Sequence, residues 1–433
     1  MSWFEKQFKL QEHKTDVKTE VLAGITTFMT MAYIIFVNPG ILSATGMPFG
    51  SLLVATCLGA ALATFLMAFL ANYPFALAPG MGLNAFFAFT VVLGMKISWQ
   101  TALAAVFIEG LIFIALTLTK VREDVVNSIP TTLKIGISAG IGLFITFIGL
   151  QGAGIVVKND AVLVGLTSFR AHMPAVLALI GLMLMVTLEV KKVRGGILIG
   201  IIVVTILGIP FGITKLPTGV ISMPPSLGPI FWKMDFSSIM NPNFWVIVLT
   251  FFFVDFFDTV GTLVGVSSRA GMLDSKGRLP KASAALMSDA VGTAAGAVLG
   301  TSTVTTFVES ASGVEQGGRT GLTALVVAVL FLLAMFFNPI ISIVPACATA
   351  PALIMVGGFM MMGFKDMKFD DWTEFFPAMM AFFMMPFAYS IAAGIEFGVV
   401  SFVILKVLTG KTKDIHWIMY VLAVLFILNR AFM

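Results

Sequence analysis

Long apolar runs dominate the chain and recur at intervals that suit membrane crossing. A spanning helix needs about 20 largely apolar residues, and this criterion predicts about fourteen spans. They lie near 21–42, 50–72, 75–94, 98–119, 131–152, 173–190, 195–213, 243–266, 281–300, 302–318, 321–338, 346–363, 373–391 and 394–410. A last apolar stretch, 415–431, is either an extra span or a helix lying on the membrane. The pattern predicts an all-α polytopic membrane protein.

Two of these runs are poor helix formers. The third, PFALAPGMGLN at 74–84, holds two prolines and two glycines, and the tenth has six consecutive β-branched or hydroxyl residues at 301–306. Each is predicted to be an extended piece followed by a half-helix. Unpaired backbone is excluded from lipid, so both segments are expected to line a cavity enclosed by protein. The N-terminus of a half-helix also presents free N–H groups to such a cavity.

The polar stretch 214–242 divides the chain into two halves of seven spans, 21–213 and 243–410. An arm at 1–20 precedes them and a segment at 411–433 follows. An odd number of spans in each half inverts the second half relative to the first. Inverted repeats with paired interrupted segments are typical of secondary transporters, whose binding site lies near the middle of the membrane.

Composition and charge agree with this organisation. Of the 433 residues, 58% are hydrophobic and 11% are charged, whereas a soluble domain has about 25% charged residues. With the N-terminus inside, 20 of the 26 Lys and Arg residues fall on the cytoplasmic side, as the positive-inside rule requires. The first twenty residues lack a cleavage site and read as a cytoplasmic arm. We expect a multi-pass protein of the cell membrane that binds no nucleic acid, because its basic residues sit at span ends.

Cysteine and histidine exclude some chemistry. Cys57 and Cys347 lie in apolar segments, so no disulfide framework is indicated. The histidines, His13, His172 and His416, lie in polar connections without a metal-type cluster. The sequence therefore predicts no metal site, no cofactor and no catalytic residue.

Five acids fall within the spans without a nearby Lys or Arg: Glu109, Asp255, Asp258, Asp289 and Glu309. Buried carboxylates without a basic partner are costly, so some must be protonated or hold a cation. One interpretation is proton or cation coupling together with binding of a neutral polar solute. The other is structural, with protonated acids bonded to the helix backbone, and it is favoured for Glu109 and Asp289.

Further candidates come from position. Asp255 and Asp258 are three residues apart and share one helix face, where mutual repulsion suits one of them to carrying a proton. Asn84 opens the first half-helix, where it either binds solute or caps the helix. Phe307, in the second extended piece, is placed to stack on a flat ligand, and its neighbour Thr306 completes the set.

Three stretches carry a family resemblance: PFALAPGMGLNAFFAF (74–89), FFFVDFFDTVGTL (251–263) and TSTVTTFVESASGVEQGGRTG (301–321). They resemble the AzgA-like guanine/hypoxanthine permeases, a branch of the nucleobase–cation symporters, and the likeness runs from about residue 15 to 410.

The resemblance implies a seven-plus-seven inverted repeat, often found as a homodimer. Its core domain corresponds to 21–119 and 243–338, and its gate domain to 131–213 and 346–410.

The resemblance also assigns roles to residues of this chain. Asp258 and Glu309 would hold the base, Phe307 would stack on its ring, and Asn84 would supply a further polar contact. Asp258, Glu309 and Asp255 are the candidates for proton coupling. A carboxylate accepts two N–H groups from a purine edge, and an amide both donates and accepts.

We therefore expect a proton-coupled importer of guanine or hypoxanthine, with adenine a further candidate and sodium a less favoured coupling ion. The alternative is another solute on the same fold, either uracil or xanthine, or an anion such as sulfate or bicarbonate. An anion is disfavoured because the acids would repel it. A channel would show selectivity rings, and an intramembrane protease would need a catalytic pair that the sequence lacks.

Overall fold

The computed structural model describes residues 3–119, 130–217, 219–269, 271–272, 279–367 and 369–432. Up to residue 207 the elements are α1 (Trp3–Phe8), α2 (Val17–Met31), α3 (Ile34–Ser43), α4 (Phe49–Leu66), η1 (Met67–Ala71), β1 (Leu77–Pro79), α5 (Met81–Ala85), η2 (Phe86–Gly94), α6 (Trp99–Thr119), α8 (Thr131–Gly152), β2 (Val156–Asn159), β3 (Leu163–Leu166), α9 (Met173–Val190) and α10 (Gly196–Leu207).

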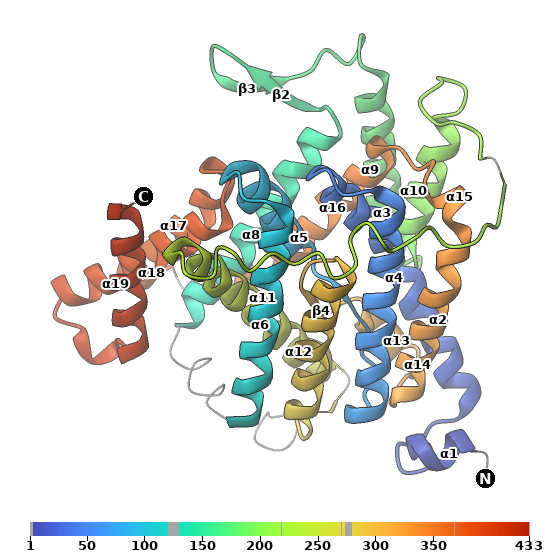
Figure 1. The fold of residues 1–433 in the computed structure, drawn as a ribbon, viewed down its shortest axis with the longest axis horizontal. Helices are drawn as coiled ribbons and strands as arrows, with labels where there is room; N and C mark the ends of the chain where they lie inside the picture. The colour runs from blue at the N-terminus through green and yellow to red at the C-terminus, as the bar shows by residue number, and fades with distance from the viewer. Residues whose placement is uncertain are drawn as a thin grey trace.

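The remaining elements are α11 (Pro242–Arg269), α12 (Ala282–Leu299), β4 (Val304–Thr306), α13 (Ser310–Glu315), α14 (Gly321–Ala334), η3 (Met335–Phe337), α15 (Asn338–Ile341), α16 (Ala346–Met361), η4 (Met362–Asp366), α17 (Trp372–Phe387), α18 (Ile391–Leu408), η5 (Thr412–Asp414) and α19 (Trp417–Phe432). The hairpin β2–β3 and the N-terminal α1 project from opposite ends of the helical body (Figure 1).

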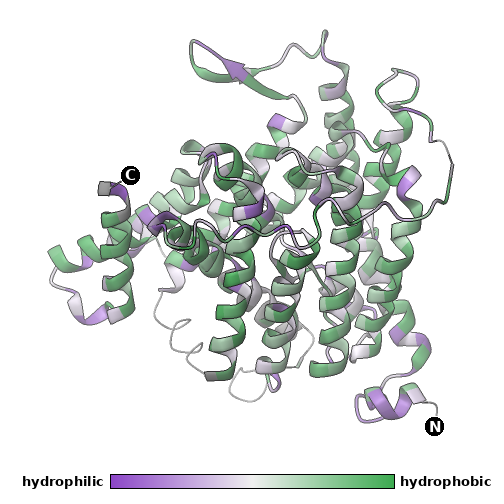
Figure 2. Ribbon diagram, in the orientation of Figure 1, coloured by the Kyte–Doolittle hydropathy of each residue, from purple (hydrophilic) through white to green (hydrophobic). Residues whose placement is uncertain are grey.

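The predicted membrane architecture is confirmed. Within the described residues, nine helical stretches are long and apolar enough to cross a membrane. Shorter apolar helices at Met81–Gly94, Gly196–Leu207, Pro242–Phe256 and Trp417–Leu428 account for further predicted segments. Apolar residues cover the helices, while polar residues concentrate at α1 and in the connections (Figure 2).

The two interrupted segments meet as a two-stranded ribbon inside the helical body. Strand β1 pairs antiparallel with β4, with Leu77 opposite Thr306 and Pro79 opposite Val304. The ladder continues on both sides, where Gly80 N–H donates to the Thr303 carbonyl at 3.0 Å and Phe307 N–H donates to the Ala76 carbonyl at 2.9 Å. Pairing satisfies backbone groups that would otherwise be unpaired away from water. The predicted extended pieces and half-helices are therefore present.

Gly80 permits this close pairing. A Cβ at Gly80 would lie 2.6 Å from Thr305 Cγ2, nearer than two carbon atoms can approach. Only glycine lets α5 begin directly after β1 while β4 stays alongside.

The helices pack in two groups. In one, α2 packs on α14, α14 on α4, α12 on α4 and α6, and α11 on α6. In the other, α8 packs on α16 and α17, α17 on α18, and α16 on α9 and α10. Glycine allows close approach in the second group, since a Cβ at Gly142 would lie 2.5 Å from the carbonyl oxygen of Gly357.

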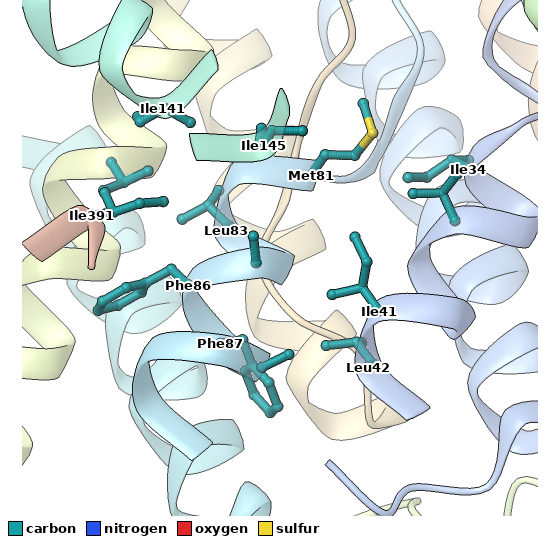
Figure 3. Packing of buried hydrophobic residues seen from close by; sticks show 14 of the residues in the cluster. Ile34, Ile41, Leu42, Met81, Leu83, Phe86, Phe87, Ile141, Ile145 and Ile391 are labelled. Carbon is teal, nitrogen blue, oxygen red and sulfur yellow. The ribbon is translucent and has the colours of Figure 1, made fainter. Parts of the chain in front are cut away.

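The two groups touch along an apolar seam (Figure 3). Met81 and Leu83 from α5 lie between α3 on one side and Ile141 and Ile145 of α8 on the other (Figure 3). A Cβ at Gly82 would lie 2.8 Å from Ile141 Cγ2, so α5 presses closely on α8. The half-helix is thus held between the two groups of helices.

Candidate functional site

Glu309 follows β4 and occupies the N-cap position of α13, yet its side chain makes no capping bond to that helix. One carboxylate oxygen, Oε1, instead accepts a hydrogen bond from the phenol of Tyr33. Tyr33 is fully buried and lies in the break between α2 and α3. Sequence reasoning missed this residue. The available signal was its rarity, because it is one of four tyrosines and stands within an apolar run.

Asp258, from α11, reaches the same place. It lies near enough to interact electrostatically with both Glu309 and Tyr33. Both residues are of intermediate burial. The structure therefore brings together the two acids that the resemblance assigns to substrate, one from the helix α11 and one from the N-cap of α13.

The other expected site residues lie on or beside the paired strands. Asn84 is fully buried, and its Oδ1 accepts a hydrogen bond from the Ser302 hydroxyl. Asn84 does not cap α5, because Gly80 occupies that N-cap position. Phe307 is 4% exposed and follows directly after β4.

Two buried polar atoms among these residues have no protein partner, Asn84 Nδ2 and Thr306 Oγ1. Buried polar atoms nearly always have a hydrogen-bond partner. A donor on the first interrupted segment and a hydroxyl on the second are therefore available to a bound polar molecule.

The remaining acids, Glu109 on α6, Asp255 on α11 and Asp289 on α12, are all fully buried. The Thr303 hydroxyl donates to Glu109 Oε2 at 2.8 Å, and Glu109 lies near enough to Asp255 and Asp289 to interact with both. Asp255 thus lies with Glu109 and Asp289, not beside Tyr33.

Thr259 connects this second group of acids to β4. Its Oγ1 lies 3.2 Å from Asp255 Oδ1, 3.0 Å from Asp289 Oδ1 and 2.7 Å from Thr305 Oγ1. A hydroxyl has only one hydrogen to donate. The Thr259 hydroxyl can donate to only one of the two aspartates. The other aspartate can form a hydrogen bond to Thr259 only if it is protonated and donates to the hydroxyl oxygen. The group therefore retains at least one protonated carboxyl.

Glu20 fastens the half-helix region to α2. It is fully buried and accepts hydrogen bonds from the backbone N–H groups of Arg319, Thr320 and Thr323 at 2.9, 3.2 and 3.3 Å. These groups surround the N-terminus of α14, where a carboxylate is favoured by the helix dipole. The structure begins α2 at Val17, so Glu20 lies in the first turn of a helix.

The threonines of α2 follow the ordinary pattern for helices. Thr26 donates to the Leu22 carbonyl at 2.9 Å, and Thr30 donates to the Thr27 carbonyl at 2.8 Å. These hydroxyls bond back to their own helix.

A cavity of about 570 Å³ lies elsewhere, between the start of α11 and α19. Its lining is almost wholly apolar, including Trp245, Val246, Leu249, Leu422 and Phe426. None of the described residues that line it is titratable.

Comparison with known proteins adds relatives and fold neighbours. The sequence model of the Permease family (Xan_ur_permease) matches residues 18–397. The chain is 46% identical to the guanine/hypoxanthine permease PbuG of Bacillus subtilis, covering 98% of this chain and 99% of that one. It is 44% identical to the adenine permease AdeQ of Escherichia coli, covering 98% and 95%. The transmembrane domain of the cyanobacterium bicarbonate transporter BicA shares the fold, with a TM-score of 0.66, 17% identity and coverage of 89% and 96%.

Proposed function

Because this chain belongs to the Permease family, we propose that it imports purine nucleobases by proton symport through alternating access. The observation that carries the proposal is the meeting of Asp258 and Glu309 beside Tyr33, at the end of the paired strands. Relatives named for guanine/hypoxanthine and for adenine, at 46% and 44% identity, support a purine as the substrate class.

The chemistry of the site fits a flat, neutral, polar ring. Guanine and hypoxanthine offer N–H donors along one edge, and the carboxylates of Glu309 and Asp258 are the acceptors. Asn84 Nδ2 supplies a donor for a ring nitrogen or a carbonyl oxygen, and Thr306 supplies a hydroxyl. Phe307 provides the face on which the ring stacks.

A bicarbonate-type anion is the main alternative, since BicA shares the fold. Two adjacent carboxylates would repel an anion. Among the described residues, Lys406 is the only buried base, and it bonds to Glu374 and Asp414 at the end of α18. The charge at the site therefore favours a neutral base over an anion.

Proton coupling follows from the same pair of acids. Two carboxylates that are close enough to interact electrostatically, in a largely buried site, resist being ionised together. A proton on Asp258 leaves Glu309 charged to accept the base, so base and proton favour the same loaded state. Asp255, which lies with Glu109 and Asp289, is the third acid that we assign to proton coupling.

Transport requires the site to face each side in turn. We assign the core to 21–119 and 243–338, the gate to 131–213 and 346–410, and a sliding motion to the seam between α5 and α8. The N-terminus is cytoplasmic, the chain is a multi-pass protein of the cell membrane, and two copies form a homodimer.

The test is uptake of labelled hypoxanthine into proteoliposomes with an imposed pH gradient. Uptake should follow the gradient, collapse with a protonophore, and be blocked by unlabelled guanine or adenine but not by bicarbonate. Glu309→Gln should abolish uptake while the protein still inserts. Uptake that ignored the proton gradient and followed sodium would remove the coupling, and uptake of bicarbonate alone would replace the substrate class.

A further inference from the structure

Tyr33 stands where two helices are interrupted and has one specific partner. Helix α2 ends at Met31 and α3 begins at Ile34, so the tyrosine occupies the break between them. Its side chain has no exposed surface. A buried phenol normally needs a hydrogen-bond partner, and the partner is Glu309 Oε1, 276 residues away in sequence.

Glu309 depends on this contact for its orientation. Glu309 occupies the N-cap position of α13 but makes no side-chain bond to that helix. With Oε1 held by the phenol, Oε2 and the second lone pair of Oε1 remain for other donors. Tyr33 therefore decides which acceptor sites the carboxylate presents.

The charged side chains near Glu309 do not orient its carboxylate in place of Tyr33. Helix α13 packs against α2 and α11. Asp258 on α11 has the same charge as Glu309, and Asp255 faces the second group of acids. Other titratable groups are directed elsewhere: Lys18 to the surface, Glu20 to the α14 N-terminus, and Arg319 to the carbonyls of Val314 and Gly318. Glu315 ends α13, six residues from Glu309 along the chain.

We propose that Tyr33 is a positioning residue that orients Glu309, and so sets the affinity for the base and the pH range over which it binds. The inference rests on the proposed function. A phenol that donates to a carboxylate stabilises its charged form. Removing the phenol therefore leaves the charged form of Glu309 without this donor, and fewer molecules present the acceptor that the base needs.

The experiment compares Tyr33→Phe with Tyr420→Phe, a matched change on the partly exposed Tyr420 of α19. Initial rates of hypoxanthine uptake are measured against substrate concentration over a series of pH values. For Tyr33→Phe we expect the apparent KM at neutral pH to rise about tenfold, as for loss of one hydrogen bond to a charged group. The pH at which uptake declines should move about one unit upward, while Vmax changes little. Tyr420→Phe should match the wild type.

Several outcomes decide against the proposal. Equal KM and pH dependence in both variants would refute it, and so would a fall in Vmax alone, which indicates a purely structural role. If Tyr33→Phe fails to fold, Glu309→Asp replaces it, because the shorter side chain withdraws from the phenol and should shift the pH dependence in the same direction. An unshifted Glu309→Asp profile overturns the idea.

Failure of the proposed function gives a different result. The wild-type protein would then take up no purine. In that case the energetic coupling between Tyr33 and Glu309 is measured by thermal unfolding instead of by uptake. Thermal unfolding of Tyr33→Phe, Glu309→Gln and the double variant should be non-additive, because the residues are in direct contact. Additive effects would show that the contact has no energetic role.

Discussion

The hydroxyl of Thr303 donates a 2.8 Å hydrogen bond to Glu109 Oε2, across 194 residues of sequence. This contact fastens the end of β4 to α6, away from the acids that flank Tyr33. Thr305, two residues on, bonds to Thr259 on α11. Alternate residues of a strand face the same side. Thr303 and Thr305 therefore point to one side, where Thr303 bonds to Glu109 and Thr305 reaches Asp289 through Thr259.

Removing the Thr303 contact should therefore weaken the fold. Thr303→Val keeps the volume but leaves Glu109 Oε2 without its donor, and an unsatisfied buried group costs about 1–3 kcal/mol. The thermal unfolding temperature of the purified protein should fall by several degrees. The control is Thr187→Val, since Thr187 is exposed on α9 and bonds only to its own helix. An equal fall in both variants would contradict the assigned role of Glu109.

A second prediction follows from the close approach of Gly80 to Thr305. Gly80→Ala places a methyl group 2.6 Å from Thr305 Cγ2 and pushes the strands apart. Hypoxanthine uptake should drop at least about tenfold, because small misplacements of binding groups have large effects. Thr305→Ser removes Cγ2 but keeps the hydroxyl, so the double variant should regain much of the activity. No recovery in the double variant would show that the clash is not with Thr305.

Lys406 gives a third prediction, away from the site. It is buried at the end of α18, with Glu374 Oε1 and Asp414 Oδ2 each 3.3 Å from its Nζ. Breaking a buried ion pair by removing one partner costs about 3–5 kcal/mol, reduced here because Glu374 and Asp414 are partly exposed. Lys406→Met should lower the unfolding temperature far more than Lys158→Met, whose pair with Asp160 is exposed. Equal effects would mean that the buried pair adds no stability.

A fourth prediction concerns pH. A hydrogen bond from Lys411, together with bonds from Thr373, lowers the pKa of Asp371 at the start of α17. A carboxyl whose pKa is depressed on folding stabilises the protein above its ordinary pKa, and that contribution disappears as the pH falls through the depressed value. Asp371→Asn should thus lower the unfolding temperature at neutral pH, and the difference from wild type should shrink below about pH 4. Asp370→Asn, at the exposed neighbouring position, serves as the control; a difference that stays constant with pH would exclude the ionic contribution.

Much of the fold was predictable from local sequence. The predicted span at 131–152 coincides with α8, and the run at 281–300 is within a residue of α12. The prolines and glycines of 74–84 and the hydroxyl-rich run at 301–306 correctly predicted the strand and half-helix pieces. The run at 195–213 gave a shorter helix that ends at Leu207, because Gly208, Pro210 and Gly212 follow.

The site was predictable only in part. The motifs indicated Asp258, Glu309, Asn84 and Phe307, whereas the signal for Tyr33 was only its rarity as a tyrosine within an apolar run. Nor did the three-residue spacing of Asp255 and Asp258 show that their side chains would separate into different groups.

Hydrophobicity and chain stiffness act within a few neighbouring residues, which is why the sequence alone determined the membrane helices and their interruptions. Which acids meet depends on contacts such as Tyr33 with Glu309 and Thr303 with Glu109, made between segments 276 and 194 residues apart in the sequence. Only the packing of α4, α11 and α12 on β4, with Tyr33 and α6 bonded to the same segment, placed two acids beside a phenol and the other three beside threonines. That division is a property of the assembled helices, since a buried carboxyl is stable only where a donor or a proton meets it.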